Sequence, residues 1–271
     1  FLTQRKRKAD YISSHGHTIY HQPAAGYTFQ LGDGKALSAA AHLPVVYDFR
    51  SKDVALGGQG APLVPIGDRL LFSEYEYCLN LGGIANISFE EKGKRRAFDI
   101  CPCNLVLNYL AEKKGLPYDQ DGQLAAAGKV SQLLLDQLSE WTYYRKNYPK
   151  SLGREEIELQ VIPLLEKSGL SIADLSATYC RHIAQHIALC IRQSSSKMLV
   201  TGGGAFHTHL LKEIRSAVSC EVVVPPTEII QFKEAIIFAF LGALHVAGEI
   251  NTLSSVTGAR EDSVGGELIK D

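Results

Sequence analysis

Asp99 is the side chain with the clearest chemical potential, because it stands at the end of the strand-like run RRAFDI, Arg95–Ile100. A carboxylate at a strand end beside a phosphate-binding turn can take a proton from an attacking hydroxyl or water, or orient Mg²⁺. An isolated aspartate is more often a helix cap. The catalytic reading of Asp99 therefore depends on phosphate-binding turns elsewhere in the chain.

Three consecutive glycines, Gly202, Gly203 and Gly204, lie between a β-branched run and a helical pattern in LVTGGGAFH. Without side chains, the backbone can approach a ligand closely, and the N–H groups of the following helix favour an anion. A tight strand-to-helix turn usually needs only one glycine, so the three favour contact with a nucleotide. The pattern is neither a Walker A loop nor a complete GxGxxG, so a dinucleotide-binding fold is not indicated.

A second glycine turn, Gly82 and Gly83 in LGGIAN, interrupts a strand-like run. Glycine weakens a strand unless another group must come close, and a phosphate is such a group. A β-bulge accounts for this pair equally well.

The segment VVYDFRSKDVALGGQGAPLVP brings Asp48, Arg50 and Asp53 next to a Gly- and Pro-rich stretch. Arg50 offers a planar fork for a carboxylate or carbonyl-rich ligand, although a salt bridge within a loop would use the same residues. The Gly and Pro content predicts a long irregular loop from Ser51 to Pro65.

Several cysteines and histidines have spacings that raise the question of a metal site. His182 and His186 share one helix face, but no acidic residue lies between them as in HExxH. Cys-x-Cys lacks the usual two-residue gap and has no second pair. We predict no metal site among these residues, which are Cys101, Cys103, Cys180, His182, His186, His15, His17 and His21.

Composition places the chain among globular proteins, with 271 residues, 45% hydrophobic and 21% charged. A net charge of -1 provides no global field for nucleic acid or an anionic membrane, and the basic run Arg5–Lys8 is interpreted as a solvated helix end. No run approaches about 18 uninterrupted apolar residues. Six cysteines, mostly in apolar runs, favour reduced thiols and a cytoplasmic location. The chain opens at Phe1 and its only methionine is Met198, which predicts an incomplete start.

The elements that must position these groups alternate between strand and helix. Leu79–Asp99 reads as antiparallel strands, Ile172–Arg192 as a long helix, and Trp141–Arg154 as an aromatic and basic loop. Phe232–Gly248 is apolar nearly all round, which predicts a helix enclosed by other elements. We predict an α/β fold with a first lobe at 1–103 and a second at 104–271, the last segment crossing back.

Taken in order, these motifs resemble those of the anhydro-N-acetylmuramic acid kinase family, almost from end to end. The resemblance rests on SHGHTIYHQP, DFRSKDVALGGQGAPLVP, LNLGGIANIS, AFDICPCN, VTGGGAFH, FKEAIIFAFLGAL and NTLSSVTGA. It implies a two-lobed ribonuclease-H-like fold of the actin-like ATPase type around a cleft. It also implies an enzyme that uses ATP, Mg²⁺ and water to open a 1,6-anhydro sugar bridge and phosphorylate O6 in peptidoglycan recycling, with a homodimer as its assembly.

The resemblance assigns a role to each matching position. Asp99 is the expected general base, and Gly82, Gly83 and Asn86 are the expected phosphate hairpin. Gly202, Gly203 and Gly204 are expected on the adenosine side. The expected sugar contacts are His17, Thr18, Arg50 and Glu234.

The sequence departs from the family pattern at three places. DTGPGN is here DICPCN, so Cys101 and Cys103 replace glycines, and His207 stands where asparagine is frequent. The family's N-terminal glycine-rich phosphate hairpin is not in the sequence before Phe1, which truncates the first lobe. A polypeptide that truly starts there is expected to have little kinase activity. The competing hypotheses are a non-catalytic sugar- or nucleotide-binding remnant and a metalloprotein of the same superfamily.

Overall fold

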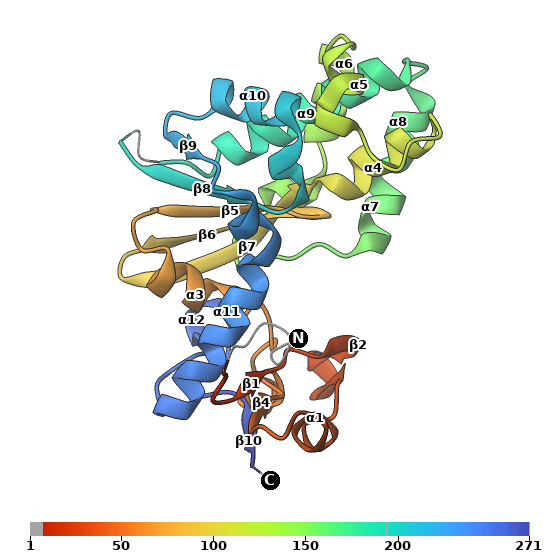
Figure 1. Ribbon diagram of the computed structural model, residues 1–271. Helices are drawn as coiled ribbons and strands as arrows, with labels where there is room; N and C mark the ends of the chain where they lie inside the picture. Colours follow the sequence, from red (N-terminus) through yellow and green to blue (C-terminus); the bar gives the residue numbers. More distant parts are fainter. Residues whose placement is uncertain (1–7, 193–194, 271) are drawn as a thin grey trace. The chain divides into compact units, whose positions relative to one another are not determined.

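The structure is a computed structural model that describes residues 8–192 and 195–270. It separates into two compact units, each of which is described by itself. Unit 1 contains Phe1–Ser73, Glu91–Arg96 and Phe232–Asp271, and unit 2 contains Glu74–Glu90 and Ala97–Gln231. Both units combine helices and strands, which confirms the predicted α/β class (Figure 1). Residues 5–7 of the basic run at the start lie outside the described residues.

Unit 2 is built on a five-stranded sheet with the order β7-β6-β5-β8-β9. Strand β6 is antiparallel to β5, whereas β8 is parallel to β5 and β9 is parallel to β8. Strands β5, β6 and β7 form a meander, and β8 and β9 extend the sheet parallel to β5. This is the arrangement expected for a ribonuclease-H-like fold. The strands are β5 (Tyr77–Leu81), β6 (Ile84–Glu91), β7 (Lys94–Pro102), β8 (Lys197–Thr201) and β9 (Glu221–Val223).

The helices of unit 2 pack around α9, which contacts α4, α5, α6 and α10 (Figure 1). Helix α9 ends at Ala188, so the long helix predicted in this region is confirmed with a slightly earlier end. The helices are α4 (Asn104–Glu112), α5 (Gln123–Ala126), α6 (Gln132–Ser139), α7 (Arg154–Gln160), α8 (Ile162–Lys167), α9 (Ile172–Ala188) and α10 (Thr208–Ala217). Three short 3₁₀ segments are η2 (Gln120–Gly122), η3 (Thr142–Arg145) and η4 (Gly203–Phe206).

The core of unit 2 lies between the sheet and these helices. Leu79 and Leu81 on β5 and Ile183 and Ile187 on α9 have no exposed surface. Strand β5 is central in the sheet, which explains why the run YCLNL is almost continuously apolar. All six cysteines are free thiols, and five of them are buried, as predicted from their apolar neighbours.

Unit 1 contains a three-stranded sheet of order β1-β4-β10 and the separate hairpin β2-β3. Val45 and Val46 on β4 are fully buried, as expected for the central strand. The elements are β1 (Ile12–Ser13), β2 (His17–Gln22), η1 (Pro23–Ala25), β3 (Tyr27–Leu31), α1 (Gly34–Ala41), β4 (Val45–Tyr47), α2 (Ser51–Ala55), α3 (Val64–Leu71), α11 (Thr227–Ala247), α12 (Ser254–Thr257) and β10 (Glu267–Ile269). Helix α11 begins five residues before the unit 1 segment that contains most of it.

The prediction of a long irregular loop after Arg50 is wrong. The segment forms α2, a stretch without regular structure at residues 56–63, and the start of α3. The buried carboxylate of Asp53 imposes this order, because it accepts hydrogen bonds from the Gly60 N–H at 2.7 Å and the Thr257 hydroxyl at 2.7 Å. Asp53 therefore holds the glycine-rich stretch instead of facing a ligand.

The prediction that Phe232–Gly248 is an enclosed helix is also wrong. Helix α11 is long and apolar enough to cross a membrane, by length and composition only, but 28% of its apolar window is buried. It buries one side, where Ile237 lies against Gly67 of α3, and leaves Phe232 about half exposed on another. Apolar composition alone did not reveal how many neighbours the helix has.

The division into units differs from the predicted boundary at residue 103. Residues on both sides of that position belong to unit 2, because the β5–β7 meander is hydrogen-bonded into the same sheet as β8 and β9. The segment Phe232–Asp271 groups with the first 73 residues in unit 1.

Candidate functional site

The two predicted glycine turns lie next to each other in unit 2. Gly82 and Gly83 connect β5 to β6, and Gly202 follows β8, the strand paired in parallel with β5. Asn80 and Thr201 are register partners at the ends of these two strands. The expectation that the turns come from different lobes was wrong, because β5 and β8 are neighbours in one sheet.

Packing requires glycine at two of the three positions after β8. Gly202 has a φ of 82°, and a Cβ there would lie 2.8 Å from the carbonyl oxygen of Leu81. A Cβ on Gly204 would lie 2.7 Å from the Cβ of Leu81. Gly203 is different, because it is exposed and its Cβ would make only an ordinary contact of 3.5 Å with Asn104. The open position at Gly203 leaves room for another molecule to approach the backbone.

Asn104 holds the first turn and lies beside the second, although the sequence reading did not assign it a role. Its side-chain amide donates to the Leu81 carbonyl at 2.8 Å, and its backbone N–H donates to the Gly82 carbonyl at 3.1 Å. The preceding N–H, of Cys103, donates to the Gly83 carbonyl at 2.9 Å. The available signal was a polar residue at the first position of a helix directly after a strand.

Asn80 and Asn86 occupy facing positions on β5 and β6. A Cβ on Gly82 or Gly202 would approach the Asn80 side chain to 3.1 Å or 2.6 Å, so this amide lies between both turns. Asn86 was predicted and Asn80 was not. The signal for Asn80 was a polar residue inside an otherwise apolar strand.

Asp99 is half-buried near the end of β7, on the strand that leads to Asn104. Its Oδ2 accepts a hydrogen bond from the Leu152 N–H at 2.9 Å, and its backbone N–H donates to the Lys150 carbonyl at 3.2 Å. The Tyr143 hydroxyl donates to the Asp99 carbonyl at 2.6 Å. Residues of the Trp141–Arg154 segment therefore fix both the backbone and the side chain of Asp99.

Burial raises the pKa of Asp99, and the hydrogen bond from Leu152 opposes the rise. Among the described groups, no charged neighbour is a cause of this shift. A carboxylate with a raised pKa is a stronger proton acceptor than an exposed aspartate once it is ionised.

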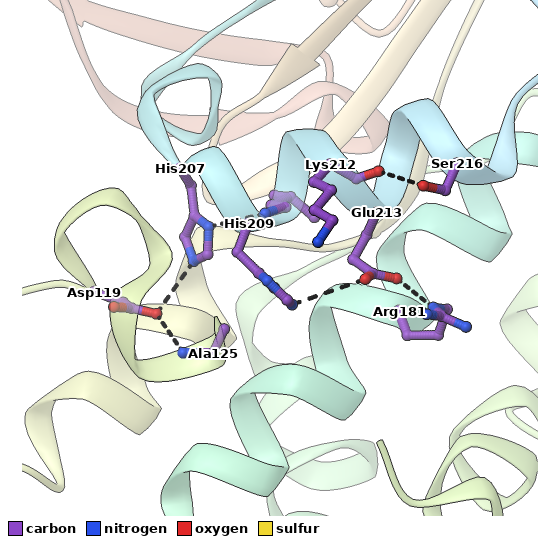
Figure 2. Close-up of polar contacts among 9 residues, drawn as sticks. Asp119, Ala125, Arg181, His207, His209, Lys212, Glu213 and Ser216 are labelled. Atoms are coloured by element: carbon purple, nitrogen blue, oxygen red, sulfur yellow. Dashed lines mark hydrogen bonds and ion pairs between the residues drawn. The ribbon is translucent and has the colours of Figure 1, made fainter. Parts of the chain in front are cut away.

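His207, the departure from the family pattern, begins helix α10 (Figure 2). Its Nδ1 accepts a hydrogen bond from the Leu210 N–H at 3.1 Å, so in the neutral ring the proton is on Nε2, which lies 3.4 Å from Asp119. Burial lowers the pKa of His207, and the charge of Asp119 opposes this. Asp119 in turn accepts from the Leu124 and Ala125 N–H groups. His207 thus ties the helix after the glycine turn to the start of α5.

A second polar group anchors the other side of α10. Glu213 forms an ion pair with Arg181 of α9, and His209 lies 3.9 Å from Glu213 (Figure 2). These contacts fix α10 on α9 and explain the polar residues there by packing.

In unit 1 the structure gathers Arg50, His15 and Glu234. Arg50 donates to the His15 Nε2 at 2.7 Å and to the Gly60 carbonyl at 2.6 Å, and its buried Nε has no hydrogen-bond partner within the described residues. His15 Nδ1 donates to the Gly16 carbonyl. Burial, and then the charge of Arg50, lower the pKa of His15, whereas Glu234 raises it. The sequence reading selected His17 and missed His15.

A cavity of about 350 Å³, with both polar and apolar side chains in its wall, opens beside His15. His17 and Thr18 are not part of its wall, but they pair with Leu31 and Gln30, which are. Hydroxyl, amide and carboxylate groups are the usual partners of sugar hydroxyls. The polar side chains of its wall are Ser14, His15, Thr28, Gln30, Asp33, Tyr47, Asp48 and Ser51.

The histidine pair of α9 packs among aromatic rings. The His182 Nε2 hydrogen-bonds to the Tyr144 hydroxyl at 2.9 Å, and the Tyr144 ring stacks on His186 with centroids 3.7 Å apart. Within residues 8–192 and 195–270, no group of three or more His, Cys, Asp or Glu side chains is placed to hold a metal ion.

Comparison with known proteins identifies strong sequence relatives. The family model described as anhydro-N-acetylmuramic acid kinase matches residues 2–270. A protein of that name from Paramagnetospirillum magneticum is 38% identical, over 93% of this chain and 73% of the relative. Another, from Rhizorhabdus wittichii, is 36% identical, over 96% of this chain and 73% of the relative.

Similarities among solved structures are weaker. Component A of the (R)-2-hydroxyglutaryl-CoA dehydratase of Acidaminococcus fermentans is 18% identical, with a TM-score of 0.42 over 64% of this chain and 63% of its own. A ROK family glucokinase from Streptomyces griseus, in complex with glucose and AMPPNP, is 14% identical with a TM-score of 0.31, over 80% of this chain and 74% of its own.

Proposed function

Because the chain belongs to the anhydro-N-acetylmuramic acid kinase family, we propose that it phosphorylates 1,6-anhydro-N-acetylmuramic acid with ATP while water opens the anhydro bridge. The family match over nearly the whole chain is the observation that carries this proposal. The reaction would serve peptidoglycan recycling in the cytoplasm. Groups of both units would contribute to this one reaction.

The glycine turns of unit 2 fit the phosphates of a nucleotide. Gly203 is open and Gly83 is exposed, so packing leaves both backbones accessible, and Asn104 bonds to Leu81 and Gly82 at the first turn. Mg²⁺ usually keeps several waters and binds through substrate phosphates, so the nucleotide itself would bring most of the ligands of the cation to these turns. When bound, MgATP supplies the phosphoryl group, and the cation neutralises charge that develops on the phosphate oxygens.

Asp99 is proposed as the general base. Its carboxylate would accept a proton from the water molecule that bonds to the anomeric carbon, while the bond from that carbon to O6 breaks and O6 becomes the phosphoryl acceptor. The raised pKa increases its basicity, and the hydrogen bond from Leu152 fixes one oxygen and leaves the other for the water.

Arg50, Glu234, His17 and Thr18 are proposed to bind the sugar. The unpartnered Nε of Arg50 provides a donor that binding would satisfy, and His15 fixes the guanidinium plane from the other side. This arrangement suits a substrate that carries a carboxylate and several hydroxyl groups.

The test is ADP release with the anhydro sugar, with the phosphorylated product identified by mass. We expect Asp99→Asn to lower kcat by about 10²–10⁴-fold with near-normal nucleotide affinity, because a general base contributes that much. Asp136→Asn, an exposed change on α6 of the same unit, should leave kcat unchanged.

Turnover by Asp99→Asn at the parent rate would remove Asp99 from the mechanism. Nucleotide binding without ADP release, in the parent chain and in a chain extended to the length of its relatives, would support a non-catalytic binding protein instead.

A further inference from the structure

Both ring nitrogens of His15 in unit 1 have a partner, and the two partners determine where the proton lies. Nδ1 is 2.9 Å from the Gly16 carbonyl oxygen, and Nε2 is 2.7 Å from Nη2 of Arg50. A carbonyl oxygen can only accept a hydrogen bond and a guanidinium can only donate one. Nδ1 must therefore carry the proton, and Nε2 must be an unprotonated acceptor. Only this neutral tautomer satisfies both hydrogen bonds.

The hydrogen bond to His15 is one of two that set the plane of the Arg50 guanidinium. Nη2 donates to His15 and Nη1 donates to the Gly60 carbonyl at 2.6 Å, so both ends of the planar group are held. A guanidinium recognises a carboxylate through a fork of fixed geometry, which makes its orientation as important as its charge. Loss of the bond to His15 would therefore leave the charge of Arg50 in place and remove its orientation.

The His15 ring is packed so that it supports Arg50 instead of bonding to a ligand. Its centroid lies 4.3 Å from that of Phe238, a buried ring of α11, with 58° between the two planes. His15 also forms part of the wall of the cavity of about 350 Å³. Because both nitrogens are already engaged, the imidazole would meet a molecule in this cavity only through its carbon atoms.

Protonation of His15 would break this arrangement. The proton would go to Nε2, which would then be a donor facing the Arg50 donor, with two positive charges side by side. Burial and then the charge of Arg50 lower the pKa of His15, and His17 acts in the same direction, whereas Glu234 and the Gly16 carbonyl raise it. The ring is therefore neutral near pH 7 and takes up a proton in acid. The other titratable groups on the wall of the same cavity are Asp33, Tyr47 and Asp48.

We propose that His15 is a positioning residue of the sugar site, and that it orients Arg50 for the substrate carboxylate only while its Nε2 is unprotonated. Acid then weakens sugar binding, because a proton on Nε2 breaks the bond to Arg50 and leaves the guanidinium free to turn. The inference rests on the proposed function, since it concerns the sugar that Arg50 is proposed to bind. A direct charge contact has the opposite sign, because a protonated His15 would attract the carboxylate and acid would strengthen binding.

The first test is NMR spectroscopy of the full chain with ¹⁵N-labelled histidine and no substrate. Near pH 7 we expect the ring nitrogens of His15 to show a proton on Nδ1 and none on Nε2, and to titrate below the ordinary pKa of 6.5. The loss of one set of signals in His15→Phe assigns them. A proton on Nε2 at neutral pH would overturn the proposal, because that nitrogen could not accept from Arg50. This measurement does not depend on enzyme activity.

The second test is calorimetric titration of the full chain with 1,6-anhydro-N-acetylmuramic acid between pH 8 and pH 5. The affinity should fall below the pKa that NMR gives for His15, by up to about tenfold per pH unit. His15→Gln keeps an acceptor that does not titrate, so it should bind within about threefold of the parent at pH 8 and show no such fall. His15→Phe keeps a ring against Phe238 without an acceptor, and it should bind about tenfold more weakly at pH 8.

The control is His42→Asn, an exposed change in the same unit at a left-handed position that asparagine tolerates, and it should keep the parent affinity and pH profile. Equal pH profiles for the parent and His15→Gln, or stronger binding in acid, would overturn the proposal. Parent affinity in His15→Phe would also overturn it. If a variant fails to fold, the pH profile and the tautomer of the parent still decide. Absence of sugar binding at every pH would overturn the proposed function and this inference together.

Discussion

Two clusters, one in each unit, bury ionisable side chains in opposite ways: Asp68 with its cations in unit 1, and Asp99 with the histidine pair of α9 in unit 2. In unit 1, Asp68 lies 2.7 Å from Lys233 and 4.0 Å from Arg95, and all three side chains are almost fully buried. In unit 2, the half-buried Asp99 and the buried His182 and His186 have neutral contacts, such as the Leu152 N–H and the Tyr144 hydroxyl and ring. Burial shifts the pKa of each of these three groups toward its neutral form.

A buried ion pair and a buried titratable group without a counter-ion therefore serve different purposes. A carboxylate between two cations stays ionised and fixes local geometry. A carboxyl or imidazole group buried without a counter-ion changes protonation at an accessible pH and can move a proton. The Asp68 cluster therefore fixes local geometry in unit 1, whereas Asp99 and His186 in unit 2 can change protonation.

The largest expected effect comes from removal of the central charge in unit 1. Asp68→Ala leaves Lys233 and Arg95 buried side by side, and breaking a buried pair costs about 3–5 kcal/mol. Chemical denaturation should show this loss, and Asp10→Ala, at an exposed position of the same unit, should show almost none. The double variant Asp68→Leu/Lys233→Met should recover part of the stability. A loss below about 1 kcal/mol for Asp68→Ala would show that the cluster is hydrated.

Acid should destabilise unit 2 through its histidines. The folded-state pKa of His186 is about 4, below its ordinary value of 6.5, so the unfolded state binds the proton more readily. The contribution of His186 to the free energy of unfolding is therefore fully present above pH 6.5. It falls by about 3 kcal/mol as the pH drops toward 4. Denaturation between pH 7 and 4 should give a flatter profile for His186→Leu than for the parent. The exposed change His17→Leu should keep the parent slope. Parallel profiles for the parent and His186→Leu would contradict the assignment.

A smaller effect is expected from a change of shape without a change of charge in unit 1. Arg50→Lys keeps the cation but loses the fork that bonds His15 and Gly60. Sugar KM should rise about tenfold, or about 1.4 kcal/mol, with a smaller change in kcat. Steady-state kinetics would measure this, with exposed Arg260→Lys as the control. An unchanged KM would exclude Arg50 from sugar binding.

The smallest effect concerns the stability of Asp99→Asn. The folded-state pKa of Asp99 lies above its ordinary value, so stability is fully present at low pH and declines as pH rises through the raised pKa. Asparagine removes this cost and keeps an oxygen for the Leu152 N–H. Because Asp99 is only half-buried, we expect a gain below about 1 kcal/mol at pH 7–8. Denaturation of both proteins at pH 4 and pH 8 measures it, and a gain at pH 4 alone would contradict the sign.

Local patterns predicted the elements around the glycine turns correctly, because strand, glycine turn and helix are specified by neighbouring residues. The sheet order and the grouping of 74–90 with 97–231 depend on pairing between distant strands, and spacing along the chain does not encode that pairing. Asn104 was missed for the same reason, since it bonds to a turn that is more than 20 residues before it in the sequence. Asp53 was misread as a loop residue because its partner Thr257 is 204 positions away.

The sequence indicates Arg50 because a guanidinium beside a glycine-rich stretch is a recognisable anion-binding group. It does not indicate His15, because the role of this imidazole is to support Arg50 and appears only in the folded protein.

Trp141 is the only tryptophan in the sequence, and its ring lies 5.3 Å from Tyr143 and 5.5 Å from Tyr144. Tyr143 holds the Asp99 backbone, and Tyr144 lines the cavity of about 280 Å³ beside β6 and β7. The tryptophan ring therefore contacts one tyrosine that bonds to Asp99 and another that lines the cavity. Its emission can report occupancy or proton movement on either face of β7 without any attached label.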